Sequence, residues 1–119
     1  MANPVTWFEI IGSDALALQK FYADVFAWKL SPPMAEMGNY SMLDHEGHGI
    51  PGGIGGDMGD GARVSVYIEC SDPQAMLDKA VAAGAQMLMP VTQITPETTI
   101  AMFKDPAGNT MGLLKGDGH

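Results

Sequence analysis

The sequence has little of three things: cysteine, basic residues and long apolar runs. Cys70 is its single cysteine, so no disulfide can form within the chain and we expect a reducing, cytoplasmic location. Six lysines and arginines stand against fourteen acidic residues, for a formal net charge of −8. Nucleic acids and anionic membranes recruit basic proteins, so we expect neither as a partner. The sequence contains no apolar run of transmembrane length and no pattern of a secretion signal.

What remains is the composition of a single globular domain. The chain has 119 residues, of which 46% are hydrophobic and 17% are charged. That length supports one hydrophobic core rather than two independent ones. Ten methionines are a high number. Methionine fills irregular gaps in cores and also lines adaptable binding surfaces, and we expect core filling to account for most of them.

Two segments about half a chain apart share one plan. Residues 13–30 and 71–88 both begin with Ser-Asp after a short apolar strand, and both space their apolar residues as a helix does. In the second segment Asp72 is a helix cap, Pro73 suits the first helical position and Gly84 suits the end. Strand-like stretches broken by turns follow each helix, including "AWKL" in the first half and the hairpin turn "DPAGN" in the second. The chain is therefore predicted as an α+β fold of two βαβββ modules.

The two modules are predicted at about residues 1–56 and about residues 63–116 of one domain, 1–119. A Gly-rich, acidic stretch at about 52–62 overlaps the end of the first module and is predicted to be a flexible junction. We reject a phosphate-binding loop here, because the charged side chains are Asp57 and Asp60, which would repel phosphate.

Glu9 lies in the apolar stretch "TWFEII", where an ionised carboxylate without a partner would cost several kcal/mol. Side chains alternate between the two faces of a strand, so Trp7 and Glu9 share one face while Phe8 and Ile10 share the other. The apolar faces must pack under the helices, and Glu9 then points to the opposite face. The matching face of the second module holds Ser65, Tyr67 and Glu69.

The opening "WFEI", the helical "DALALQKFYADVFAWKL" and the closing "FKDPAGNTMGLL" resemble the vicinal-oxygen-chelate superfamily. That superfamily contains glyoxalase I, bleomycin-resistance proteins, fosfomycin-resistance enzymes and extradiol dioxygenases, and the match is similar to its uncharacterised glyoxalase-like proteins. The resemblance implies that the strands of the two modules form a half-open, cup-shaped mixed sheet. It also implies that the face carrying Glu9 lines the ligand cup, and that two copies of the chain close the cup as a homodimer.

The resemblance further implies where a metal ion would be held, on the first and last strands of each module. The corresponding positions here are Trp7, Ser65, Gly112 and a glycine near Gly52 or Gly53. An indole, a hydroxyl and two hydrogens cannot replace the nitrogen and oxygen donors that a divalent ion needs. We therefore expect no metal and no other cofactor, and none of the superfamily mechanisms that use a metal as Lewis acid.

Three interpretations of Glu9 remain open. Its carboxylate either pairs with a lysine, an arginine or a backbone N–H, or orients a small ligand, or acts as a catalytic general acid or base. The predicted ligand-binding residues are Trp7, Glu9, Ser65, Tyr67, Glu69 and Gly112.

Two other candidates for chemistry are assigned no role. His45 and His48 form an H-x-x-H pair, but it lies in the turn "DHEGHG", whereas metal-binding pairs usually sit on a rigid element. We expect both to be solvated turn residues. Cys70 has no basic residue or His–Asp arrangement nearby in the sequence, so we expect an inert residue of the core.

Two functions follow from these patterns. The first is a metal-free small-molecule binding protein of the glyoxalase/bleomycin-resistance type, which sequesters a drug-like or cationic ligand. The alternative is a lyase or isomerase that uses Glu9 as acid or base, or that recruits a divalent metal through unusual ligands such as Glu9 and Glu69. A purely structural dimerisation module is a third interpretation, and it predicts no response to any ligand.

Overall fold

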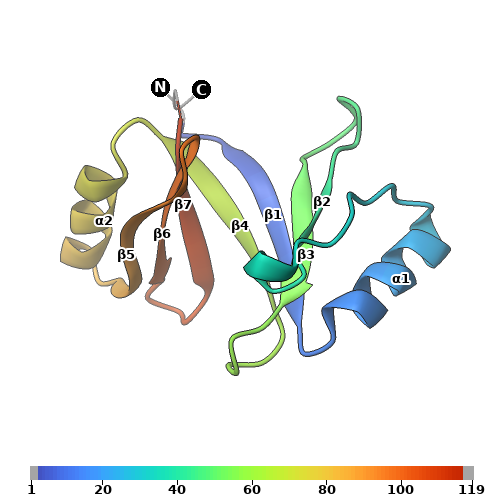
Figure 1. Ribbon diagram of the computed structural model, residues 1–119. Helices are drawn as coiled ribbons and strands as arrows, with labels where there is room; N and C mark the ends of the chain where they lie inside the picture. Colours follow the sequence, from blue (N-terminus) through green and yellow to red (C-terminus); the bar gives the residue numbers. More distant parts are fainter. Residues whose placement is uncertain (1–2, 117–119) are drawn as a thin grey trace. The chain divides into compact units, whose positions relative to one another are not determined.

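The computed structural model describes residues 3–116, which form seven strands and two helices together with a short 3-10 turn (Figure 1). This confirms the predicted α+β class. The described residues divide into two compact units, one of residues 7–64 and one of residues 65–116 with residues 3–6. Neither described helix is long and apolar enough to cross a membrane.

The unit of residues 7–64 lies mostly in the first half of the chain and includes the first strand from residue 7 on. Its elements are β1 (Val5–Gly12), α1 (Ala15–Phe26), β2 (Ser41–Leu43) and β3 (Gly52–Gly56), with the 3-10 turn at Ala35–Met37. Strand β3 pairs with β1 in parallel and with β2 in antiparallel fashion. Helix α1 begins after Asp14, whose carboxylate accepts a hydrogen bond from the backbone N–H of Ala17 at 3.1 Å.

One strand predicted in this unit is almost missing. The stretch "AWKL" makes only a single bridge, between Leu30 and Leu43. Pro32 and Pro33 follow after Ser31, and proline has no amide hydrogen to give to a neighbouring strand. The ladder therefore stops after one pair, and the chain passes through the 3-10 turn before β2 begins.

The second unit forms the complete βαβββ pattern. Its elements are β4 (Arg63–Cys70, of which residues 65–70 belong to this unit), α2 (Pro73–Ala82), β5 (Gln86–Thr95), β6 (Thr98–Lys104) and β7 (Thr110–Lys115). Strand β7 lies between β4, to which it is parallel, and β6, to which it is antiparallel. The predicted cap is present, because Asp72 accepts a hydrogen bond from the backbone N–H of Ala75 at 3.1 Å. The predicted hairpin turn joins β6 to β7, and its Asp105 accepts backbone hydrogen bonds from Ala107 and Asn109.

Helix α2 covers a core made by the strands of its own unit. The buried residues of this core are Cys70, Leu77, Ala101 and Leu113. Cys70 is fully buried, and this burial raises the pKa of its thiol, with the nearby charge of Asp72 acting in the same direction. The thiol is therefore held neutral, as expected of an inert core residue.

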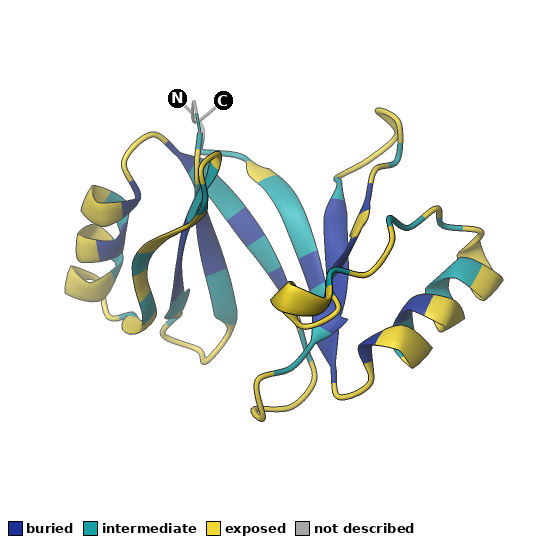
Figure 2. Ribbon diagram, viewed as in Figure 1, coloured by how far each residue is buried: buried dark blue, intermediate teal, exposed yellow. Residues whose placement is uncertain are grey.

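The first predicted module and the predicted junction overlap at residues 52–56, and the structure forms strand β3 from these residues. Residues 52–56 form a regular strand, buried along almost its whole length (Figure 2), and only residues 57–62 lie between this strand and β4. Glycine is required here because aromatic rings lie directly over the backbone. A Cβ at Gly52 would lie 2.3 Å from the ring of Phe8, and one at Gly53 would lie 2.1 Å from the ring of Tyr40.

Candidate ligand-binding site

The predicted alternation of faces is observed in both units. In β1 the Phe8 ring packs against Trp28 at 5.9 Å between centroids, and a Cβ at Gly12 would face Leu18 of α1. Trp7 and Glu9 therefore lie on the face away from α1. In β4 the side chain of Ile68 packs on the core under α2, which places Tyr67 on the face opposite that helix.

Glu9 forms an ion pair with Arg63, the first residue of β4. Its Oε1 accepts a hydrogen bond from Nη2 of Arg63 at 2.8 Å. The side chains of Arg63 and Glu9 are only 24% and 11% exposed, so the pair is largely shielded from water. The first of the three interpretations of Glu9 is thus observed: a partly buried carboxylate held by an arginine, at a cost in desolvation that the short charged hydrogen bond offsets.

Trp7 lies on the same face of β1 and is fixed by Tyr40. The indole Nε1–H donates a hydrogen bond to the Tyr40 hydroxyl at 3.0 Å. The Tyr40 ring in turn lies over the bare backbone of β3 at Gly53 and Gly55. This contact sets the orientation of the indole, because a buried Trp N–H needs an acceptor.

Trp7 also lines a cavity of about 580 Å³ at the β2 edge of this unit. That volume lies within the range of small-molecule binding sites. The other lining residues are Lys29, Leu30, Ser31, Met42, Leu43, Asp44 and Pro51. Most of the wall is apolar, while Lys29 and Asp44 bring one charge of each sign to it. The cavity can therefore take a flat apolar body that carries a polar or charged substituent.

The remaining predicted ligand-binding residues belong to the other unit, where they fill space in the sheet. Ser65 and Tyr67 are buried, and the Tyr67 hydroxyl lies 3.9 Å from the sulfur of Met102. Gly112 pairs with Tyr67 in the β4–β7 ladder. Glu69 is half-buried, and its carboxylate lies over the backbone at Gly116. Trp7 is thus the one predicted residue that lines the 580 Å³ cavity.

The positions implied for a metal ion do not fit one. On the last strand of each unit the implied ligand position is a glycine, and an aromatic ring occupies the space where a side chain would extend from it. The ring is that of Tyr40 at Gly53 and that of Tyr67 at Gly112. A Cβ at either glycine would lie 2.1–2.3 Å from its ring, so a longer ligand side chain would not fit without displacing the tyrosine. Among residues 3–116, no three His, Cys, Asp or Glu side chains come together as they would around a metal ion. The rings have taken the space that metal ligands would need.

The expectation that His45 is a solvated turn residue is wrong. Its ring is half-buried and packs against Phe8 and Trp28, at centroid distances of 6.4 and 5.4 Å. Trp28 also stacks on Tyr22 at 5.1 Å. His45 therefore completes an aromatic cluster beside α1, a contact that depends on residues distant in the sequence and could not be read from the turn alone.

Solved structures with the same architecture define the class of fold. Methylmalonyl-CoA epimerase of Mycobacterium tuberculosis is similar with a TM-score of 0.67, at 15% identity, over 93% of this chain and 86% of that one. A glyoxalase/bleomycin resistance protein/dioxygenase superfamily member of Vibrio splendidus is similar with a TM-score of 0.65, at 15% identity, over 92% and 96%. The fold is that of the glyoxalase/bleomycin resistance/dioxygenase superfamily, as the sequence resemblance implied.

The family follows from the sequence comparison. A model of the glyoxalase-like domain matches residues 9–114, so the chain belongs to the glyoxalase-like domain family. It is 29% identical, over 95% of its length, to CFP32 of Mycobacterium tuberculosis, which carries the provisional name of a glyoxylase. It is also 29% identical, over 92% of its length, to the anthracycline biosynthesis protein DnrV of Streptomyces peucetius. The chain spans 46% of each of these two proteins, about half of their length.

Proposed function

We propose that this protein binds a flat, drug-like small molecule, without the help of a metal ion, in the cavity beside Trp7. The observation that carries the proposal is that cavity, an apolar space of about 580 Å³ with an indole on its wall and a charge of each sign at Lys29 and Asp44. The rings over Gly53 and Gly112, where metal ligands would have to stand, support the metal-free part of the proposal. The net charge of −8 favours a cationic ligand over an anionic one.

The relatives suggest which compounds to try first. DnrV is named as an anthracycline biosynthesis protein, and the superfamily name includes bleomycin resistance. We therefore choose an anthracycline and bleomycin as probes and measure binding by calorimetry on the full chain.

Replacing Trp7 by alanine is expected to weaken binding of the better probe about 30-fold, which corresponds to about 2 kcal/mol. The substitution removes the aromatic surface on which a flat ligand would lie. Calorimetric titration of the wild type and of Trp7→Ala, each shown by circular dichroism to be folded, measures the change in Kd.

Trp28→Phe provides the matched control, because Trp28 lies in the aromatic cluster with Phe8 and Tyr22 and does not line the cavity. Its Kd should stay within about twofold of the wild type. Equal losses in the two variants, or no loss in Trp7→Ala, would show that the probe binds elsewhere.

An enzyme is the second candidate, and the Glu9–Arg63 pair is the observation that favours it. A largely buried carboxylate lies on the same face of β1 as Trp7, and Glu9 would be the acid or base of a lyase or isomerase reaction. Methylmalonyl-CoA epimerase and the provisional glyoxylase are among the similar proteins.

The two candidates differ in their response to divalent ions. Thermal stabilisation by Zn²⁺, Ni²⁺ or Mn²⁺ that disappears in Glu9→Gln would favour the enzyme, with Glu9 as an unusual metal ligand. Stabilisation by an organic probe but by none of the ions would favour the binding protein.

We also propose that the protein works in the cytoplasm as a homodimer. The single, buried thiol suits a reducing compartment, and the named relatives have room for two domains of this size. Much of helix α1 is coloured as exposed in Figure 2, and four of its apolar side chains are more than half exposed. These side chains are Leu16, Phe21, Val25 and Phe26.

Light scattering at micromolar concentration is expected to give a mass near twice the 12.6 kDa of one chain. Phe21→Ser combined with Phe26→Ser should shift the mass to that of a monomer, because it removes the apolar contact surface of α1. Met58→Ser is the control, since Met58 is 91% exposed and lies in the connecting segment. A monomeric wild type would contradict the proposal.

A further inference from the structure

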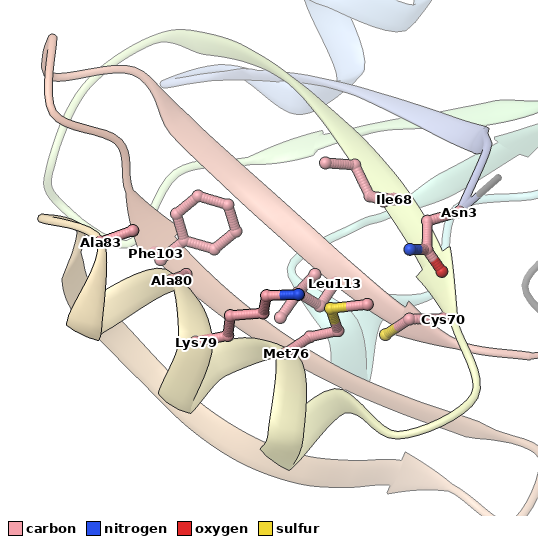
Figure 3. Close-up of a pocket in the computed structure, with 9 residues that line it drawn as sticks. All are labelled: Asn3, Ile68, Cys70, Met76, Lys79, Ala80, Ala83, Phe103 and Leu113. Atoms are coloured by element: carbon pink, nitrogen blue, oxygen red, sulfur yellow. The ribbon is translucent and has the colours of Figure 1, made fainter. Parts of the chain in front are cut away.

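A second cavity lies in the other unit, between α2 and the strands that it covers (Figure 3). Its volume is about 330 Å³, near the lower end for small-molecule sites. Its lining residues all come from residues 3–6 and 65–116, so the cavity is formed by this unit alone. It lies on the helix side of the strands, whereas Tyr67 and Gly112 lie on the opposite face.

The walls of this cavity are almost entirely hydrocarbon and sulfur. The apolar lining residues are Ile68, Cys70, Met76, Ala80, Ala83, Phe103 and Leu113. Cys70 does not add a charge, because its burial holds the thiol in the neutral form. Burying an alkyl chain against such walls is favourable because it removes apolar surface from water, whereas a polar group would find almost no hydrogen-bond partner there.

One charged side chain lines the cavity, that of Lys79. Figure 3 shows it extending from α2 toward Met76 and Leu113. Lys79 is exposed, and none of the ion pairs found among residues 3–116 involves it. Its ammonium group is thus available to a ligand while its methylene stem covers apolar surface. Asn3 adds the one neutral amide of the lining.

We propose that this cavity is a second binding site, which takes a short n-alkyl carboxylate with its chain against the apolar wall and its carboxylate at the ammonium group of Lys79. The apolar wall selects the chain, and the lysine selects the charge of the head group, because its short-range attraction outweighs the screened, long-range effect of the net charge of −8. This site is independent of the proposed site at Trp7, since the two cavities share no lining residue.

The test is a calorimetric series of n-alkyl carboxylates from butanoate to decanoate on the full chain. Affinity is expected to rise about fourfold for each added methylene until the cavity is full, and then to level off. The alcohol of the same chain length should bind about threefold to fivefold more weakly than the carboxylate. Octanoate and a probe bound at the Trp7 cavity should bind together without competition.

Matched variants locate the site. Lys79→Gln should remove the preference for the carboxylate over the alcohol, while Lys115→Gln, at an exposed lysine of β7 outside the lining, should keep it. Ala80→Phe fills the cavity and should weaken octanoate binding at least about tenfold, whereas Ala82→Phe adds the same ring at an exposed position of α2 and should not. Ala80→Leu replaces Ala80→Phe if the larger ring prevents folding.

Three results would overturn this proposal: no saturable binding of octanoate at millimolar concentration, equal affinity for the carboxylate and the alcohol, or unchanged binding in a folded Ala80 variant. None of them bears on the Trp7 cavity. The failure of an anthracycline or bleomycin to bind would equally leave the octanoate result unaffected, so the failures of the two proposals are distinguishable.

Discussion

Alanine at position 112 is expected to lower the free energy of unfolding by about 3 kcal/mol. Gly112 pairs with Tyr67 on one side of β7 and with Met102 on the other, inside the sheet. The added methyl group would lie 2.3 Å from Cδ2 of Tyr67, a side chain that is only 5% exposed. The ring can move only by displacing its neighbours, since the interior is closely packed. Urea unfolding measures the loss, and the Tm should fall by about 10 °C.

Two further variants separate this clash from the general cost of replacing a glycine. At Gly116 the atoms nearest to an added Cβ belong to the side chain of Glu69, which is half-buried and more flexible than an aromatic ring, so Gly116→Ala should cost less than about 1 kcal/mol. Combining Gly112→Ala with Tyr67→Ala should cost at least about 2 kcal/mol less than the sum of the two single changes, because the ring that causes the clash is gone. Additive losses would show that the clash with Tyr67 is not the cause.

Replacing Arg63 by methionine is expected to lower the free energy of unfolding by about 3 kcal/mol. The change keeps most of the volume of the side chain but takes the charged partner from Glu9, whose carboxylate is only 11% exposed. An ion without its counter-charge is costly in such a place, far more than the intact pair is worth. Urea unfolding at neutral pH measures the effect.

The double variant Glu9→Gln with Arg63→Met should recover at least about half of that loss, since it leaves no unbalanced charge behind. Lys20→Met is the surface control. It breaks the ion pair with Asp24, in which the two side chains are 76% and 60% exposed, and should cost less than about 0.5 kcal/mol. A loss as small for Arg63→Met as for Lys20→Met would mean that water screens the Glu9 pair as well.

Local signals in the sequence predicted most of the fold. The cap at Asp72, the hairpin turn at 105–109 and the alternation along β1 and β4 each act over a few residues, and each is observed. Strand β3 was harder to predict, because strand patterns are recognised from branched and aromatic side chains and this strand is nearly all glycine. Its partners, Phe8 and Tyr40, are supplied by distant parts of the chain.

The candidate site was predicted only where strand alternation determines it. Alternation placed Trp7 and Glu9 on one face, but the Arg63 partner lies 54 residues away in the chain and no pattern connects the two. The rest of the Trp7 cavity comes from three short segments, 29–31, 42–44 and Pro51, that carry no shared motif. The cavity under α2 depends on how a helix packs on a sheet, which periodicity alone does not determine.

Strand β3 also affects the order in which this unit folds. Four of its five residues are glycine, which loses more backbone freedom on folding than any other residue, and only Ile54 brings a side chain to bury. Its parallel partner β1 comes early in the chain. The two strands can pair only after the long segment between them has closed into a loop, which costs conformational entropy before any contact is gained. We therefore expect β3 to dock as a late step in folding, after Phe8 and Tyr40 have taken the positions that hold it.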